Sequence, residues 1–172
     1  MAWFYYNKKT DDTLDLNYKI KQRGWNPVHG SHKIVDKLLV KDIVKKLNSK
    51  CKVANTLDIV SNPDNIDIKK LPKSFVMKSN HGCHNNIIVK DGYILNNVAV
   101  TNNYLINNCK KWLKSEYNSD SEKQYNNIDK KVFFEEFMQD MVDHEFKFIC
   151  FYGKAKYIEY HSDRFSSHKS NL

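Results

Sequence analysis

Residues Leu71–Gly92 read LPKSFVMKSNHGCHNNIIVKDG, and this pattern predicts a β-hairpin. Phe75–Met77 and Ile87–Val89 are short apolar runs of strand type, and the turn pair Asp91-Gly92 follows the second run. Lys78 follows the first run, at the mouth of a loop of Asn, His, Gly and Cys. Backbone N–H groups can approach an anion in such a loop, so the hairpin is a candidate phosphate site. An ordinary hairpin with an exposed lysine is the alternative.

Hydrophobic periodicity predicts two main helices around this hairpin. Ser31 can cap a helix over residues 32–47, and Thr101 can cap an amphipathic helix that ends near Tyr117. Apolar residues fall on one face of each predicted helix: Val35, Leu39, Ile43 and Leu47 in the first, and Leu105, Ile106, Cys109, Trp112 and Leu113 in the second.

The remaining chain predicts mostly strands. We expect strands over residues 53–60, 132–138, 145–152 and 154–160, with a polar loop over 117–131 that adds nothing to the core. The fold class is therefore α+β, a mainly antiparallel sheet with two main helices on one side. We expect an irregular segment over residues 1–30, one domain over 31–164 and a polar tail over 165–172.

Composition limits the class of protein. A chain of 172 residues with 41% hydrophobic residues is long enough for one domain with a real core. No apolar run approaches the roughly 20 residues of a membrane span, and the amino end lacks a secretory signal pattern, so we expect a cytoplasmic protein. The four cysteines show no CxxC pair. The net charge of +8 comes from scattered lysines, which suits anionic small molecules; nucleic-acid binding is a lower-ranked alternative.

Four ordered blocks resemble the ATP-grasp superfamily, and more narrowly the TupA-like ATP-grasp proteins. They are DKLLVKDIV from Asp36, LPKSFVMKSNHG from Leu71, VFFEEFM from Val132 and EFKFICFYGKAKYI from Glu145. The resemblance covers residues 33–164. It implies an ATP-grasp-like fold and a role in capsule or teichuronopeptide polysaccharide biosynthesis, where some relatives carry glycosyltransferase labels.

The resemblance also implies which residues would bind ATP. Lysines at the positions of Lys37 and Lys78 contact phosphates, Glu135 stands at the adenine hinge, and an acidic residue at Glu145 takes the ribose hydroxyls. Lys41 stands where an arginine is common in relatives. The implied nucleotide-binding set is Lys37, Lys78, Asn80, His81, Gly82, Glu135, Glu136, Phe137 and Glu145, with the backbone of Glu136 and Phe137 on the adenine edge.

The loop departs from the family pattern at Gly82-Cys83-His84, where relatives have Gly-Ser-Gly. The added bulk puts phosphate engagement by the loop in doubt. His81, Cys83 and His84 could instead suggest zinc, but no partner pair completes a site of three or four ligands, so we predict no metal there.

Magnesium ligands of ATP-grasp enzymes come late in the fold. Only Glu159 and Asp163 stand near that position, so the chain is expected to hold an amino-terminal part of the fold, with a doubtful Mg²⁺ site and a completing partner chain as one option. The first functional hypothesis is an enzyme that forms an acyl phosphate with ATP and passes it to a sugar or amino-acid acceptor. The alternative is a non-catalytic nucleotide-binding module.

Overall fold

The computed structural model describes residues 16–94, 98–117, 122–139, 144–151, 153–162 and 169–171. The chain divides into two compact units. The larger unit spans Thr10–Phe137, and the smaller unit combines Met138–Leu172 with Met1–Lys9. The structure divides the chain between Phe137 and Met138, a point inside the domain predicted over 31–164. That domain stays a prediction.

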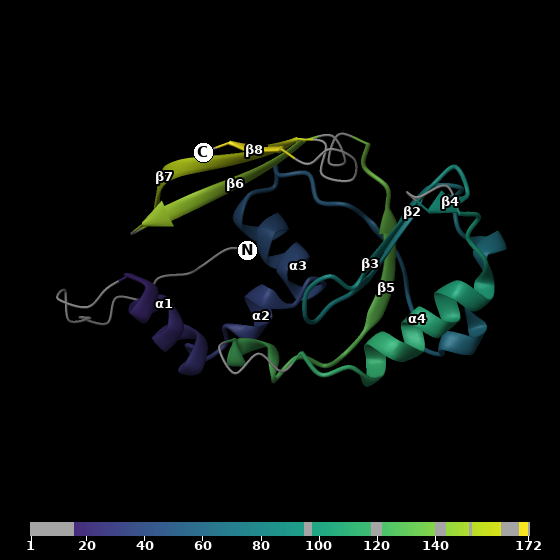
Figure 1. Cartoon of the computed structure of the whole chain (residues 1–172), viewed down its shortest axis with the longest axis horizontal. Helices are drawn as coiled ribbons and strands as arrows, with labels where there is room; N and C mark the ends of the chain where they lie inside the picture. Colours follow the sequence, from purple (N-terminus) through teal and green to yellow (C-terminus); the bar gives the residue numbers. More distant parts are fainter. Residues whose placement is uncertain are drawn as a thin grey trace. The chain divides into compact units, whose positions relative to one another are not determined.

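The larger unit is built on a five-stranded sheet with the order β1-β5-β2-β3-β4, and each pair of neighbouring strands is antiparallel (Figure 1). The predicted hairpin is confirmed, because Phe75 pairs with Val89 and Lys78 with Asn86. The strands are β1 (Thr56–Ile59), β2 (Phe75–Ser79), β3 (Asn86–Lys90), β4 (Tyr93–Ile94) and β5 (Val132–Glu136).

One face of this sheet forms the hydrophobic core with α4 (Asn102–Lys114). Thr101 caps the helix as predicted, because its side chain accepts a hydrogen bond from the Tyr104 N–H at 3.2 Å. The helix covers the sheet with the predicted apolar face. Buried core residues on both sides of this contact are Phe75, Met77, Val132 and Phe134 from the sheet and Leu105, Cys109 and Trp112 from α4.

The predicted helix over 32–47 is interrupted at Asp36. Two helices occupy the segment, α2 (His32–Val35) and α3 (Leu39–Leu47), after α1 (Leu16–Trp25). Asp36 leaves the helical conformation, and its carboxylate accepts hydrogen bonds from the N–H groups of Leu38 and Leu39 at 2.8 and 3.2 Å. The prediction was therefore wrong about continuity, since a buried carboxylate caps the start of the second helix. Ser31 makes no side-chain cap.

The placement of the helices on one side of the sheet was also wrong. Phe133 alternates with Phe134 along β5, so its ring lies on the face turned away from α4. The ammonium of Lys41 in α3 lies 5.0 Å from the centre of that ring. Hence α3 and α4 lie on opposite faces of the five-stranded sheet (Figure 1).

The segment predicted as a loop without core contacts contains buried residues. A 3-10 turn, η3 (Lys123–Tyr125), buries Gln124 and Tyr125, and Ile128 is buried after it. Two further 3-10 turns, η1 (Pro63–Asn65) and η2 (Ile68–Lys70), precede β2. The polar composition of residues 117–131 concealed these spaced aromatic and aliphatic side chains.

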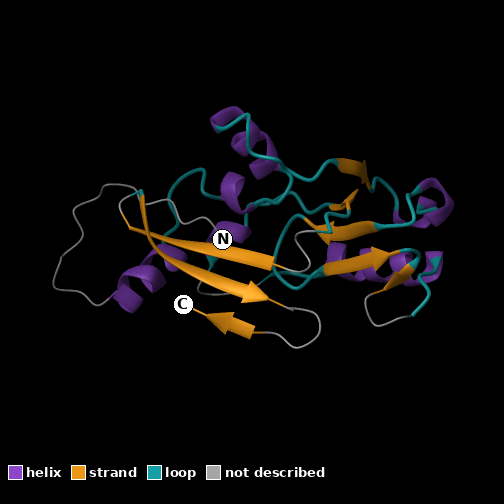
Figure 2. Cartoon of the chain, turned by 90° about the horizontal axis from the view of Figure 1, so that it is seen from above, coloured by secondary structure: helices purple, strands orange, loops and turns teal. Residues whose placement is uncertain are grey.

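The smaller unit is a three-stranded antiparallel sheet with the order β6-β7-β8. Its strands are β6 (His144–Phe151), β7 (Lys154–Ser162) and β8 (Lys169–Asn171). The predicted pair of late strands is confirmed, with Phe148 opposite Ile158. The tail holds one more strand than expected. Figure 2 separates helices from strands by colour. Among the described helices, none combines the length and apolar character that crossing a membrane requires.

Candidate functional site

The candidate site lies on the sheet face turned away from α4. Lys78 on β2 and Glu135 on β5 are placed there by strand alternation, because their neighbours Met77 and Phe134 enter the core. The Lys78 ammonium forms an ion pair with Glu135 Oε1. Glu135 is 5% exposed, and a carboxylate so deeply buried requires a partner.

Lys41 is the second partner of Glu135. Its ammonium lies 2.7 Å from Glu135 Oε2, and it also donates hydrogen bonds to the Ala54 carbonyl at 2.9 Å and to Thr56 Oγ1 at 3.2 Å. The site residues predicted from the sequence did not include Lys41. The available signal was the family resemblance, which places Lys41 where an arginine is common in relatives.

Lys37 connects this group to the loop between β2 and β3. Its backbone N–H donates to the Asn80 carbonyl at 3.0 Å, and its ammonium donates to the Gly82 carbonyl at 2.6 Å. Burial lowers the pKa of Lys37 below its ordinary value, and the nearby Lys78 cation lowers it further. The structure therefore brings Lys37, Lys41 and Lys78 together, two of them sharing one carboxylate.

Asn80 is fully buried and holds the loop in place. Its side-chain NH₂ donates to Asp36 Oδ2 at 3.0 Å and to the Asp129 carbonyl at 2.8 Å, and its Oδ1 accepts from the Lys131 N–H at 2.8 Å. These bonds tie together three chain segments far apart in sequence. Its side chain thus has its hydrogen-bonding groups engaged inside the protein.

His81 is also buried, at 2% exposure. Its Nε2 lies 3.0 Å from the Trp112 carbonyl and its Nδ1 lies 3.1 Å from Asn80 Oδ1. Burial lowers the pKa of His81, chiefly by removing water from the imidazolium, and the Lys130 and Lys37 cations act in the same direction. The hydrogen bond to the Trp112 carbonyl acts in the opposite direction. The Trp112 carbonyl and Asn80 Oδ1 are both acceptors, so a neutral ring can donate to only one of them.

The loop backbone has the form of an anion cradle. Gly82 and His84 have positive φ angles of 67° and 63°, which turns successive peptide groups. Within the described part of the chain, no acceptor takes the backbone N–H groups of residues 81–85. Successive unused N–H groups in a turned backbone bind anions. Of the two residues that depart from the family pattern, Cys83 donates its thiol to the Tyr117 hydroxyl at 3.3 Å, and His84 is exposed.

The predicted hinge residues lie at the end of β5. Glu136 accepts hydrogen bonds from the Asn55 N–H and side-chain NH₂, both at 3.0 Å, which lower its pKa. The Glu136 N–H donates to the Asn55 carbonyl at 3.0 Å, so it is already engaged. Phe137 follows the strand and is half-buried. The adenine contact of these two residues stays a prediction.

Glu145 belongs to the smaller unit, where it stands opposite His161 between β6 and β7. Its predicted ribose contact is likewise untested. Glu159 lies 3.1 Å from His161 Nε2 and 3.8 Å from the Lys147 ammonium. Asp163, the other late acidic candidate, lies outside the described residues, and so does Arg164. Across the described ranges, no group of three or more His, Cys, Asp or Glu is placed to hold a metal ion.

The arrangement suits a polyphosphate. The ammonium groups of Lys37, Lys41 and Lys78 gather near one another, and Glu135 is shared by two of them. Lysine suits phosphate as a mobile point charge, and the loop N–H groups add oriented donors beside it. A group that combines a local excess of cations with unused N–H donors fits the triphosphate of a nucleotide.

One of the comparisons with known proteins identifies a family. No curated protein and no solved structure matches the chain. A family model described as TupA-like ATPgrasp matches residues 15–172, which include Lys37, Lys41 and Lys78 (the lysine cluster), the loop over residues 80–85 and the predicted hinge residues. Since the match covers most of the chain, the protein belongs to the TupA-like ATP-grasp family.

Proposed function

We propose that the chain binds ATP or ADP on the α3 side of the larger sheet, with the phosphates held by Lys78, Lys37 and the loop over residues 80–85. The observation that carries the proposal is the cluster of three ammonium groups beside unused backbone N–H donors. Lys41 is added to the phosphate-binding set because it shares the carboxylate of Glu135 with Lys78.

Two residues of the predicted set receive a different role. Asn80 and His81 act by positioning, because their side chains fix the loop from inside the protein. Gly82 presents its backbone to the phosphates. The adenine edge is assigned to Glu136 and Phe137 on the strength of the family resemblance. The ribose role of Glu145, a residue of the smaller unit, rests on that resemblance alone. Because the Glu136 N–H is engaged with Asn55, its carbonyl is the group left for adenine.

The reaction we propose is activation of a carboxylate during polysaccharide modification. A carboxylate oxygen attacks the γ-phosphorus of ATP, ADP leaves, and the resulting acyl phosphate transfers its acyl group to an amine or hydroxyl with release of phosphate. The lysine cluster would neutralise the charge that moves onto the leaving phosphate. Family membership supports this reaction class, and the lysine cluster supports its first requirement, which is phosphate binding.

The test is calorimetric titration of the whole chain with ATP and ADP. Lys78→Ala should weaken binding by about tenfold or more, because one charge-assisted contact is lost. Lys110→Ala is the matched control, since Lys110 is also a lysine in an ion pair with one carboxylate, that of Asp64. If the Lys78→Ala variant and the unchanged chain bind ATP with equal affinity, the proposal that the phosphates bind at Lys78 is wrong. Magnesium-dependent release of ADP then separates the enzyme from a module that only binds.

A further inference from the structure

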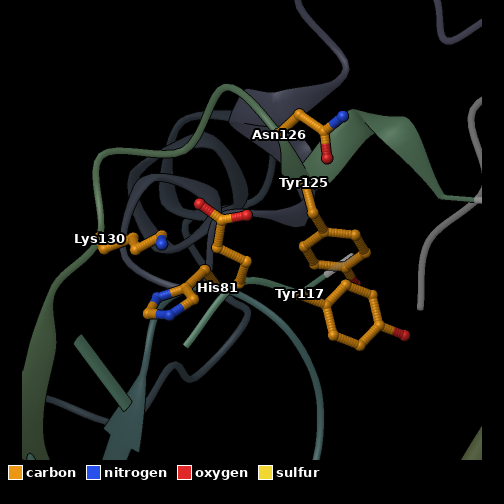
Figure 3. A pocket seen from close by; sticks show the side chains of 6 residues that line it. His81, Tyr117, Tyr125, Asn126 and Lys130 are labelled. Atoms are coloured by element: carbon orange, nitrogen blue, oxygen red, sulfur yellow. The ribbon is translucent and has the colours of Figure 1, made fainter. Parts of the chain in front are cut away.

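A pocket of about 270 Å³ lies against the other side of the loop. It is lined by His81, Glu116, Tyr117, Tyr125, Asn126 and Lys130. Figure 3 shows the rings of Tyr117 and Tyr125 together on one side, with His81 and Lys130 opposite them. The volume lies just below the roughly 300–1,000 Å³ typical of drug-sized ligands, so a smaller molecule fits.

The pocket is separate from the lysine cluster. Its lining among the described residues includes none of Lys37, Lys41 and Lys78. The His81 ring forms part of the wall and reaches the Trp112 carbonyl of α4, which covers the opposite face of the sheet. An occupant of this pocket would therefore be a second ligand beside the nucleotide.

Opposite charges line the pocket. Glu116 supplies a carboxylate and Lys130 an ammonium, and neither forms an ion pair or hydrogen bond with another described side chain. The two tyrosine rings pack edge to face at 4.8 Å and give the pocket an apolar wall. Glu116 is exposed and Lys130 is half-buried. An ammonium and a carboxylate on one pocket wall, with no partner among the described residues, suit a ligand that carries both charges.

The wall of the pocket is also part of the loop. Tyr117 lies so close to Gly82 that a Cβ there would meet its ring at 3.1 Å, and its hydroxyl accepts from the Cys83 thiol and donates to Glu122 at 2.6 Å. On the other side, Gly82 accepts from the Lys37 ammonium. Residues 81–83 therefore touch the pocket wall and the lysine cluster at once.

We propose that this pocket binds a small zwitterion of the α-amino acid class, with Lys130 on its carboxylate and Glu116 on its ammonium. The Tyr117 and Tyr125 rings cover its side chain. Occupancy shifts the position of Tyr117 and, through Gly82 and Cys83, the nucleotide affinity of the loop. This coupling rests on the proposed function, whereas the pocket itself does not.

The experiment titrates the ¹⁵N-labelled whole chain with L-alanine, and separately with acetate, methylamine and D-glucose. We expect L-alanine to give saturable shifts of the backbone amides of Tyr117, Tyr125 and Lys130. Acetate and methylamine should bind far more weakly, because each satisfies only one charge. Glu116→Gln and Lys130→Gln should each weaken L-alanine binding by about tenfold, while Lys123→Gln, which removes an exposed lysine outside the pocket, should not.

The outcomes separate the two proposals. No saturable shift with L-alanine, or an equal response to acetate, would overturn the zwitterion site, and shifts with D-glucose alone would replace it by a sugar site. Lys78→Ala should leave L-alanine binding intact while it weakens ATP binding. An ATP affinity unchanged by saturating L-alanine would overturn the coupling.

Discussion

Lys78 and Lys110 each form an ion pair with a single carboxylate, but the two pairs differ in solvent exposure and therefore in their expected contribution to stability. Lys110 and Asp64 are exposed, at 45% and 64%, and such surface pairs contribute little to stability. The Glu135 side chain is only 6% exposed, and it separates the ammonium groups of Lys41 and Lys78. Without that carboxylate, two neighbouring cations would lose their common counter-ion.

We therefore predict that Glu135→Gln lowers the free energy of unfolding by about 1–3 kcal/mol, because a buried charged acceptor is lost. Tripolyphosphate should raise the unfolding midpoint more in this variant than in the unchanged chain, since its charges replace the missing carboxylate. Asp64→Asn is the control, because the Asp64 carboxylate forms an exposed ion pair with Lys110 and not with the three clustered lysines. Thermal unfolding with and without tripolyphosphate measures both effects. Equal stability and an equal response to tripolyphosphate would show that Glu135 is not the shared counter-ion.

The second prediction at this scale concerns pH and His81. Burial lowers the folded-state pKa of His81 below its ordinary value near 6.5, so the unfolded chain binds a proton first as the pH falls. The free energy of unfolding should thus decrease from about pH 7 to about pH 5.5. His81→Gln should reduce this slope, measured by urea unfolding at each pH. A slope unchanged by the substitution would mean that His81 does not cause it. A His81 contribution of opposite sign would mean that Asn80 Oδ1 holds a protonated ring.

At the scale of elements, the start of α4 offers a clean test. The Thr101 hydroxyl accepts a hydrogen bond from the Tyr104 N–H, and α4 supplies Leu105, Cys109 and Trp112 to the core. Thr101→Ala should lower the free energy of unfolding by about 0.5–2 kcal/mol, as loss of a helix cap does. Thr101→Ser keeps the hydroxyl and should retain most of the stability. Chemical denaturation distinguishes them, and equal losses in the two variants would assign the effect to the methyl group instead.

The sequence predicted those elements whose signals are local. The hairpin of Phe75–Met77 and Ile87–Val89 and the helix after Thr101 are marked by apolar periodicity and a cap within a few residues. The break between α2 and α3 was missed because only part of its cause is local, namely the bonds of Asp36 with Leu38 and Leu39. Asp36 is held by Asn80, which lies 44 positions later in the chain. A hydrogen bond between residues far apart in the chain does not alter the hydrophobic periodicity of either segment, so the sequence pattern does not reveal it.

The same distinction applies to the site. Lys78 was visible because it follows a strand at a loop of small residues, and resemblance to relatives added Lys37. The role of Lys41 depends on the Glu135 carboxylate of a strand far along the chain, so spacing alone could not give it. Nor could sequence reveal that Asn80 and His81 face inward, since polar residues beside a glycine ordinarily indicate an exposed loop.

At the scale of the whole molecule, the question is what the net charge of +8 recognises. Interactions between exposed charges are screened beyond about 8 Å at physiological ionic strength, so scattered lysines act independently. The lysine cluster differs because its members are partly buried and adjacent. A nucleotide triphosphate is small enough to use the cluster alone, whereas a nucleic acid would draw on lysines spread over the surface.

We predict that the whole chain binds a short single-stranded oligonucleotide weakly, with an affinity that falls steeply as salt increases. This behaviour is expected of sequence-independent phosphate contacts that release counter-ions. Lys78→Ala should leave it unchanged, because one lysine among the 28 Lys and Arg residues carries little of a distributed interaction. The same variant should lose most of its ATP binding. Fluorescence anisotropy of a labelled oligonucleotide at several salt concentrations, with ATP as competitor, measures both. Tight oligonucleotide binding that ATP displaces and Lys78→Ala abolishes would place a nucleic-acid strand, rather than a free nucleotide, on the lysine cluster.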